Sequence, residues 1–151
     1  MAAPATQLDT FLVRYSPELA ALGRALLKKL RRRLPGAHEF VYDNYNALVI
    51  GFSPGEKSSQ CVLSLALYPR WINLFFLHGA HLADPQKLLK GTGTQVRSIT
   101  MKKEEDFTHP GVEPLLAQAI AASDPPFPQK GKGKLTIQAI SPRQRPRRPA
   151  R

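Results

Sequence analysis

Five apolar runs joined by short loops constrain the fold of this chain most strongly. They are HEFVYD (38–43), NALVIGF (46–52), CVLSLALY (61–68), WINLFFLHG (71–79) and VRSITM (96–101). Each has the length and the β-branched and aromatic content of a strand. The loops between the first four are too short for the crossover that a parallel pair requires, so these strands must pair antiparallel. The sequence therefore predicts an antiparallel meander of about five strands.

A long helix precedes these strands. Ser16 suits the N-cap, Pro17 suits the first helical position, and Pro35-Gly36 ends the segment. Between these signals one apolar stripe recurs at helical spacing, formed by Leu19, Leu22, Leu26, Leu27, Leu30 and Leu34. The fold class predicted is α+β, with a single antiparallel sheet packed against this helix and a C-terminal helix.

Three shorter helices are predicted from local start and stop signals. The first covers 6–15 with Thr6 as its N-cap, and the last covers 113–123 with Pro114 in its first turn. The third covers 83–91, where Asp84 suits the N-cap, Pro85 the first helical position and Gly91 the end.

Charge is distributed unevenly along the 151 residues. The chain has 22 Lys and Arg against 11 Asp and Glu, for a formal charge of +11. Residues 1–128 contribute only +3 (14 − 11), and residues 129–151 contribute +8 with no acid. We expect an N-terminal arm or short helix (1–14), an α+β domain (15–128) and a disordered basic tail (129–151). The apolar run LTIQAI (135–140) is an exception that can dock on the domain or on a partner.

Cysteine content and hydropathy limit the class of protein. The single cysteine, Cys61, excludes an internal disulfide, which fits a reducing compartment. No run approaches the roughly 18 apolar residues of a membrane span. The N-terminal residues lack a basic segment followed by an apolar one, so no secretion signal is predicted. We expect a cytoplasmic protein with no membrane association.

The glycines of KGTGTQ (90–95) superficially resemble a phosphate-binding loop. A Walker loop runs from strand to glycines to helix, whereas here the predicted order is helix, glycines, strand. We interpret Gly91 as a helix end with positive φ and Gly93 as the entry to the next strand. The alternative is a weak anion site formed by backbone N–H groups from Gly91 to Thr94, with Arg97 supplying charge.

Metal-binding and nucleophilic chemistry have weak signals. His78, His81 and Asp84 have suitable ligand atoms, but a metal site needs at least three protein ligands in a fitting arrangement. Cys61 opens a strand and has no local histidine, which indicates a small buried apolar residue. The acids 104–106 are interpreted as a solvated turn. No catalytic residue, metal site or cofactor is assigned.

The segment YDNYN (42–46) lies where a turn should join two strands. Asp43 and Asn44 tolerate the positive φ of tight turns. The flanking aromatic residues, with Trp71, can also line the edge of a pocket. The candidate ligand-binding set is therefore Tyr42, Tyr45, Trp71, Gly93 and Arg97.

The basic segments are KKLRRR (28–33), interpreted as a solvated helix end, and the tail. The tail has the charge of a polyanion binder but no aromatic residues among its charges, so binding to nucleic acid should be non-specific and salt-sensitive. The candidate residues are Lys130, Lys132, Lys134, Arg143, Arg145, Arg147, Arg148 and Arg151. The alternative is a solubilising tail without a partner.

The order of segments resembles the YdhG-like family of domains of unknown function. The resemblance covers roughly residues 15–122 and is carried by Leu34-Pro35, Glu39, VYDNYNALVIGF (41–52) and LSLALYPRWINLFFLHGAHLADPQKLLKGTGTQVRSI (63–99). It departs at Asp43-Asn44, where family members often have glycine and a proline-aromatic pair. The resemblance implies a small α+β domain and supplies no catalytic residue. Some members are linked to frataxin-like iron handling.

These observations favour a non-enzymatic module that binds a small ligand or a protein, with a second copy of the chain as one candidate partner. The uncovered face of the sheet, or the rim near Tyr42 and Tyr45, would hold the ligand. The first alternative is a non-specific nucleic-acid-associated protein that acts through its tail. The second is a metal-handling protein that uses His78, His81 and the acids 104–106.

Overall fold

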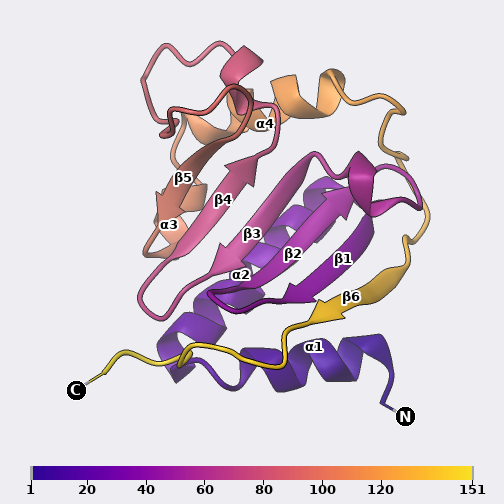
Figure 1. Cartoon of the computed structure of the whole chain (residues 1–151). Helices are drawn as coiled ribbons and strands as arrows, with labels where there is room; N and C mark the ends of the chain where they lie inside the picture. The colour runs from indigo at the N-terminus through magenta and orange to yellow at the C-terminus, as the bar shows by residue number, and fades with distance from the viewer. Residues whose placement is uncertain (1, 151) are drawn as a thin grey trace.

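A six-stranded sheet forms the centre of the protein, described here for residues 2–150 by a computed structural model (Figure 1). Its order is β5-β4-β3-β2-β1-β6. The strands are β1 His38–Asp43, β2 Leu48–Ser53, β3 Leu63–Leu67, β4 Ile72–Phe76, β5 Arg97–Met101 and β6 Leu135–Ile140. Strands β1 to β5 form the predicted antiparallel meander. The α+β class is confirmed, but the sheet is mixed because β6 pairs parallel to β1.

Strand β6 lies in the segment that was expected to be a disordered tail, and that expectation differs from the structure. The Glu39 N–H donates to the Lys134 carbonyl at 2.9 Å, and the Lys134 N–H donates to His38 Nδ1 at 3.0 Å. The apolar run 135–140 therefore docks on the domain itself. Its partner strand lies far away in the sequence, so no turn signal next to β6 could indicate this pairing.

Within residues 2–150, four α-helices accompany the sheet: α1 Pro4–Leu12, α2 Pro17–Arg33, α3 Glu104–Phe107 and α4 Val112–Ala121. Helix α2 begins as predicted, with the Ser16 hydroxyl accepting from the Leu19 N–H. Helix α1 begins two residues earlier than expected, after Ala3, and has no side-chain cap. No helix within residues 2–150 has the length and hydropathy needed to cross a membrane.

The helix predicted at 83–91 is absent. The Asp84 carboxylate accepts from the N–H groups of Leu88 and Leu89, at 3.0 and 2.9 Å, and closes a loop instead of capping a helix. Lys87 has a φ of +54°, which no α-helix accommodates. The segment then extends to pair Lys90 with Ser98. Gly91 has the expected positive φ (+134°), but at a loop and not at a helix end.

The core lies between one face of the sheet and helices α2 and α4. In Figure 1, α2 runs behind the sheet and α4 lies across its upper end. Every second strand residue faces the core, so Leu48, Leu67 and Ile72 align across three strands. The opposite face, toward the viewer, is not covered by a helix in the described part of the chain. Tyr42 and Val49 pair across this open face and are half-buried.

The register defines two ends of the sheet, named as they are drawn in Figure 1. The lower end carries the β1–β2 turn (44–47) and the β3–β4 turn (68–71). The upper end carries the loop after β2 and the segment 77–96 between β4 and β5. The C-terminal segment beyond β6 runs along the lower end.

Candidate functional site

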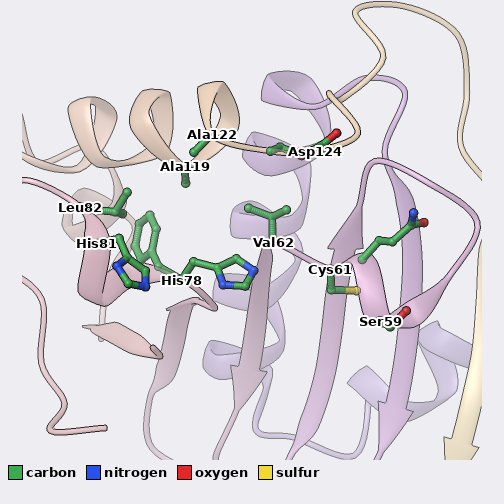
Figure 2. Close-up of a pocket in the computed structure, with 12 residues that line it drawn as sticks. Ser59, Cys61, Val62, His78, His81, Leu82, Ala119, Ala122 and Asp124 are labelled. Atoms are coloured by element: carbon green, nitrogen blue, oxygen red, sulfur yellow. The ribbon is translucent and has the colours of Figure 1, made fainter. Parts of the chain in front are cut away.

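A pocket of about 410 Å³ opens at the upper end of the sheet (Figure 2). Four separate segments build it: the loop around Ser59, the ends of β3 and β4, the 3-10 turn Gly79–His81, and the C-terminal part of α4. In Figure 2, Ala119 of α4 and Ala122, the C-cap of that helix, lie on one side, with His78 and His81 across from them. Its volume falls in the range of roughly 300–1,000 Å³ typical of small-molecule sites.

The chemistry of this upper pocket is divided between an apolar floor and a polar rim. The floor is formed by Cys61, Val62, Phe76, Leu82 and Ala119. Two imidazoles, of His78 and His81, and one carboxylate, of Asp124, contribute to the rim. Asp124 supplies the carboxylate of this rim, so the mouth favours a hydrogen-bond donor or a cation.

Cys61 is a buried apolar residue, as predicted. Its thiol packs over β2 so closely that a Cβ added at Gly51 would come within 2.8 Å of the sulfur. Burial raises the pKa of Cys61 from 9.0 to about 11, which keeps the thiol protonated at neutral pH. The chemistry that Cys61 offers the upper pocket is therefore contact rather than nucleophilic attack.

The proposed metal ligands do not assemble. His78 Nδ1 is hydrogen-bonded to Gln95 Oε1 at 3.1 Å, while Glu104 forms an ion pair with Lys29 at 3.1 Å. The Asp106 carboxylate accepts from the backbone N–H groups of Lys102 and Lys103. Across residues 2–150, no group of three His, Cys, Asp or Glu side chains is placed to hold an ion. The structure therefore does not bring together the residues named for the metal-handling alternative within residues 2–150.

The predicted ligand-binding set is split between the two ends of the sheet. Arg97 lies at the upper end and turns back on its own loop, donating to the Gly93 and Val96 carbonyls at 2.7 and 2.8 Å. Trp71 and the exposed Tyr45 lie at the lower end. Tyr42, on the open face, belongs to neither. These five residues therefore form no single site.

A second cavity, at the lower end, does contain Trp71. It has a volume of about 740 Å³ and lies between the β3–β4 turn and the C-terminal segment. Its lining residues are Asn46, Tyr68, Pro69, Arg70, Trp71, Arg145, Pro146, Arg148, Pro149 and Ala150. We call it the cationic–aromatic cleft. A shallower hollow that includes Tyr45 shares Asn46 and Tyr68 with it.

The predicted nucleic-acid set divides in a similar way. Arg147 is buried against Asp43, which removes it from contact with any polyanion. Arg145 and Arg148 line the cationic–aromatic cleft. The remaining described members are exposed: Lys130, Lys132, Lys134 and Arg143. Arg151 lies outside the described residues.

The basic segment 28–33 is engaged in ion pairs. Arg31 forms a bidentate pair with Glu39, with both N···O distances at 2.8 Å. Arg33 pairs with Glu113 of α4, and Lys29 pairs with Glu104. Much of this charge is neutralised by the domain, so the helix end is a poor site for a polyanion.

Sequence reasoning missed both cavities. His78 was considered only with His81 and Asp84 as a metal ligand, and Cys61 only as a buried strand residue, because the opposite wall of the upper pocket comes from α4 and the residues that follow it. Tyr68 and Arg70 were interpreted only as strand and turn. The sequence YPRW (68–71) did carry a signal, since two aromatic residues and an arginine share one tight turn.

Comparison of the chain with protein-family models, curated proteins and solved structures gives no match. The resemblance to the YdhG-like family therefore stays a prediction, and the function rests on the geometry described above.

Proposed function

We propose that this protein is a non-enzymatic binding module, and that the upper pocket holds a small apolar ligand with a donor or cationic head group. The observation that carries this proposal is the joining of an apolar floor to a polar rim in one half-enclosed cavity of about 410 Å³. Burial of the floor residues provides the free energy of binding, and the rim orients the ligand.

The surroundings of the polar groups that line the upper pocket support binding over catalysis. The protonated Cys61 thiol is a weak nucleophile. His78 is hydrogen-bonded to the Gln95 side chain, and neither a serine nor the cysteine is its partner. Asp124 is exposed at the mouth, where its carboxylate can accept a hydrogen bond from an amine.

Three further expectations belong to the same proposal. They are membership of the YdhG-like family, a cytoplasmic location, and a partner on the open face that is either another protein or a second copy of this chain. All three are compatible with a small α+β domain whose ligand pocket lies at one end of its sheet. A partner on the open face would leave the upper pocket accessible.

Two small-molecule probes test this function, phenethylamine and 3-phenylpropionate. They share a phenyl ring on a two-carbon chain and carry opposite charges. We expect the amine to bind more tightly, measured by chemical-shift changes of the pocket residues in NMR titrations. The variant Ala122→Phe fills the cavity from an exposed position on its wall and should abolish the shifts. The neighbouring Ala121→Phe, also exposed but outside the lining, is the matched control. Equal shifts in both variants would refute the site.

A further inference from the structure

We propose that the cationic–aromatic cleft at the lower end binds single-stranded nucleic acid, by stacking bases on aromatic rings and pairing phosphates with arginines. This site is separate from the upper pocket, which lies at the opposite end of the sheet. It also differs from the expected disordered tail, because the backbone of the C-terminal segment and the Arg148 side chain are hydrogen-bonded to the domain.

The aromatic part of the cleft is preformed. Tyr68 and Trp71 stack with ring centroids 5.5 Å apart and planes inclined by 26°. The turn that carries them is closed by the Tyr68 N–H, which donates to the Trp71 carbonyl at 2.9 Å. Both side chains are half-buried, and both line the cleft. A ring pair fixed in this way is a platform on which an unpaired base can stack without reading its sequence.

The cationic part comes from three arginines that form no ion pair within residues 2–150: Arg70, Arg145 and Arg148. Among the residues that the structure describes, no acidic side chain lines the cleft, so the charge of these arginines is uncompensated there. Arg148 donates to the backbone carbonyls of Arg14 and Val13, at 3.2 and 3.4 Å, which positions its guanidinium without neutralising it.

The C-terminal wall of the cleft is anchored on both sides of its charged residues. The Arg145 N–H donates to the Tyr45 carbonyl at 2.9 Å, and Arg147 is locked beneath the surface by Asp43 at 2.9 Å. Pro146 and Pro149 further restrict this segment. Arg145 and Arg148 therefore lie on an anchored segment across the cleft from the turn that carries Trp71, which lowers the entropic cost of binding.

Single strands fit this arrangement better than duplexes do. Stacking on a side chain requires a base that has left its own stack, which a single strand supplies at little cost. Arginines beside the rings then meet the phosphates that flank each exposed base. An acidic peptide would satisfy the charges but leave the rings unused.

Trp71 is the only tryptophan of the chain, so the tryptophan fluorescence of the protein reports directly on the cleft. We expect oligo(dT) of about 12 nucleotides to quench its fluorescence at saturation. With three phosphate contacts, the logarithm of the binding constant should fall against the logarithm of salt with a slope of about −2. Duplex DNA, heparin, free TMP and a poly-glutamate peptide are the comparison ligands, each expected to bind more weakly.

Substitutions in the full chain separate stacking from charge, with anisotropy of a labelled oligonucleotide as the readout. Trp71→Ala should weaken binding by about tenfold or more, and Trp71→Phe should restore most of it. Arg145→Gln should weaken binding and reduce the salt slope by about 0.7. Lys57→Gln removes the same charge from an exposed residue at the upper end and should change the affinity much less.

Several outcomes would overturn the proposal. They are the absence of binding, equal affinity for heparin or duplex, unchanged Trp71 fluorescence at saturation, and unchanged affinity in Trp71→Ala. Tighter binding of poly-glutamate would assign the cleft to an acidic protein partner, and tighter binding of TMP would assign it to a free nucleotide. Thermal unfolding of each variant identifies any loss that comes from misfolding.

Discussion

The guanidinium of Arg147 lies 2.9 Å from the carboxylate of Asp43, and each of the two side chains is only 2% exposed. Arg14 completes the cluster from the surface, at 3.1 Å from the other carboxylate oxygen. The Arg147 Nη groups also donate to the carbonyls of Asn44 and Tyr45, and its Cζ lies 5.9 Å from the centre of the Tyr15 ring. This cluster joins the C-terminal segment to the β1–β2 turn, and also to Arg14 and Tyr15 in the link between α1 and α2.

The variant Asp43→Asn should lower the free energy of unfolding by about 3 kcal/mol, because it leaves the buried Arg147 charge without its counter-ion. Asp9→Asn is the matched control, since it removes the exposed pair with Arg24 and should cost under about 1 kcal/mol. Urea denaturation of the two variants measures the difference. Equal losses would show that the buried pair contributes no more than a surface pair.

Truncation after Pro128 should destabilise the domain. It removes β6, exposes the backbone edge of β1, and leaves Asp43 with Arg14 as its remaining cationic partner. An unpaired edge strand favours association between chains, so we also expect aggregation at raised concentration. Light scattering and thermal unfolding of the truncated and full chains provide the measurement. A truncated chain that stays monomeric with an unchanged midpoint would contradict this prediction.

Gly133→Ala should weaken the docking of β6. A Cβ at this position would lie 1.9 Å from the Ala37 carbonyl oxygen, a backbone atom that cannot move aside without displacing the strand entry. Gly93→Ala is the control, because a Cβ there has no atom within 4 Å. Amide hydrogen exchange should show lost protection in residues 135–140 for the first variant. Unchanged protection in β6 would show that the contact is relieved by a small shift.

Alkylation of Cys61 should be slow in the folded protein. The raised pKa, about 11, lowers its thiolate fraction about 100-fold at pH 8 relative to an unfolded chain with a pKa of 9.0. Iodoacetamide labelling followed by mass spectrometry, with the urea-unfolded chain as the control, measures this ratio. Similar rates in the two states would mean that the thiol is not buried in solution.

The raised pKa of Cys61 also predicts how the free energy of unfolding depends on pH. The folded state holds the Cys61 proton more tightly than the unfolded state does, so its contribution is complete below pH 9 and is lost as the pH rises toward about 11. Cys61→Ser should flatten this part of the pH profile. If the variant and the parent lose stability in parallel over this range, other groups account for the loss.

The sequence predicted those parts of the fold that local signals determine. The five strands of the meander and the Ser16 cap were found because alternation, turn residues and capping act over a few positions. The helix at 83–91 was wrong because Asp84, an effective cap, accepts N–H groups from a loop just as well. Both the correct predictions and the wrong one concern interactions between residues that are close in the sequence.

The remaining features depend on contacts across the chain. Asp43 was interpreted as a turn residue with access to positive φ, yet Lys87 is the only non-glycine residue in 2–150 with that backbone conformation. The partner of Asp43, Arg147, is more than a hundred residues away in the sequence and was counted among the exposed charges of the tail. Both cavities likewise combine segments that no periodicity connects. One sequence without structure cannot pair such residues.

The pairing of β6 with β1 also has a consequence for the order of folding. Glu39 of β1 meets Leu135 of β6, 96 residues further along the chain. During synthesis the meander can therefore form before β6 is available, which leaves one edge of β1 without a paired strand. Such a state is prone to association with other nascent chains. Closing so long a loop also raises the contact order, which slows the last step of assembly. A chaperone that shields β1 until β6 emerges would act at the most vulnerable point of this pathway.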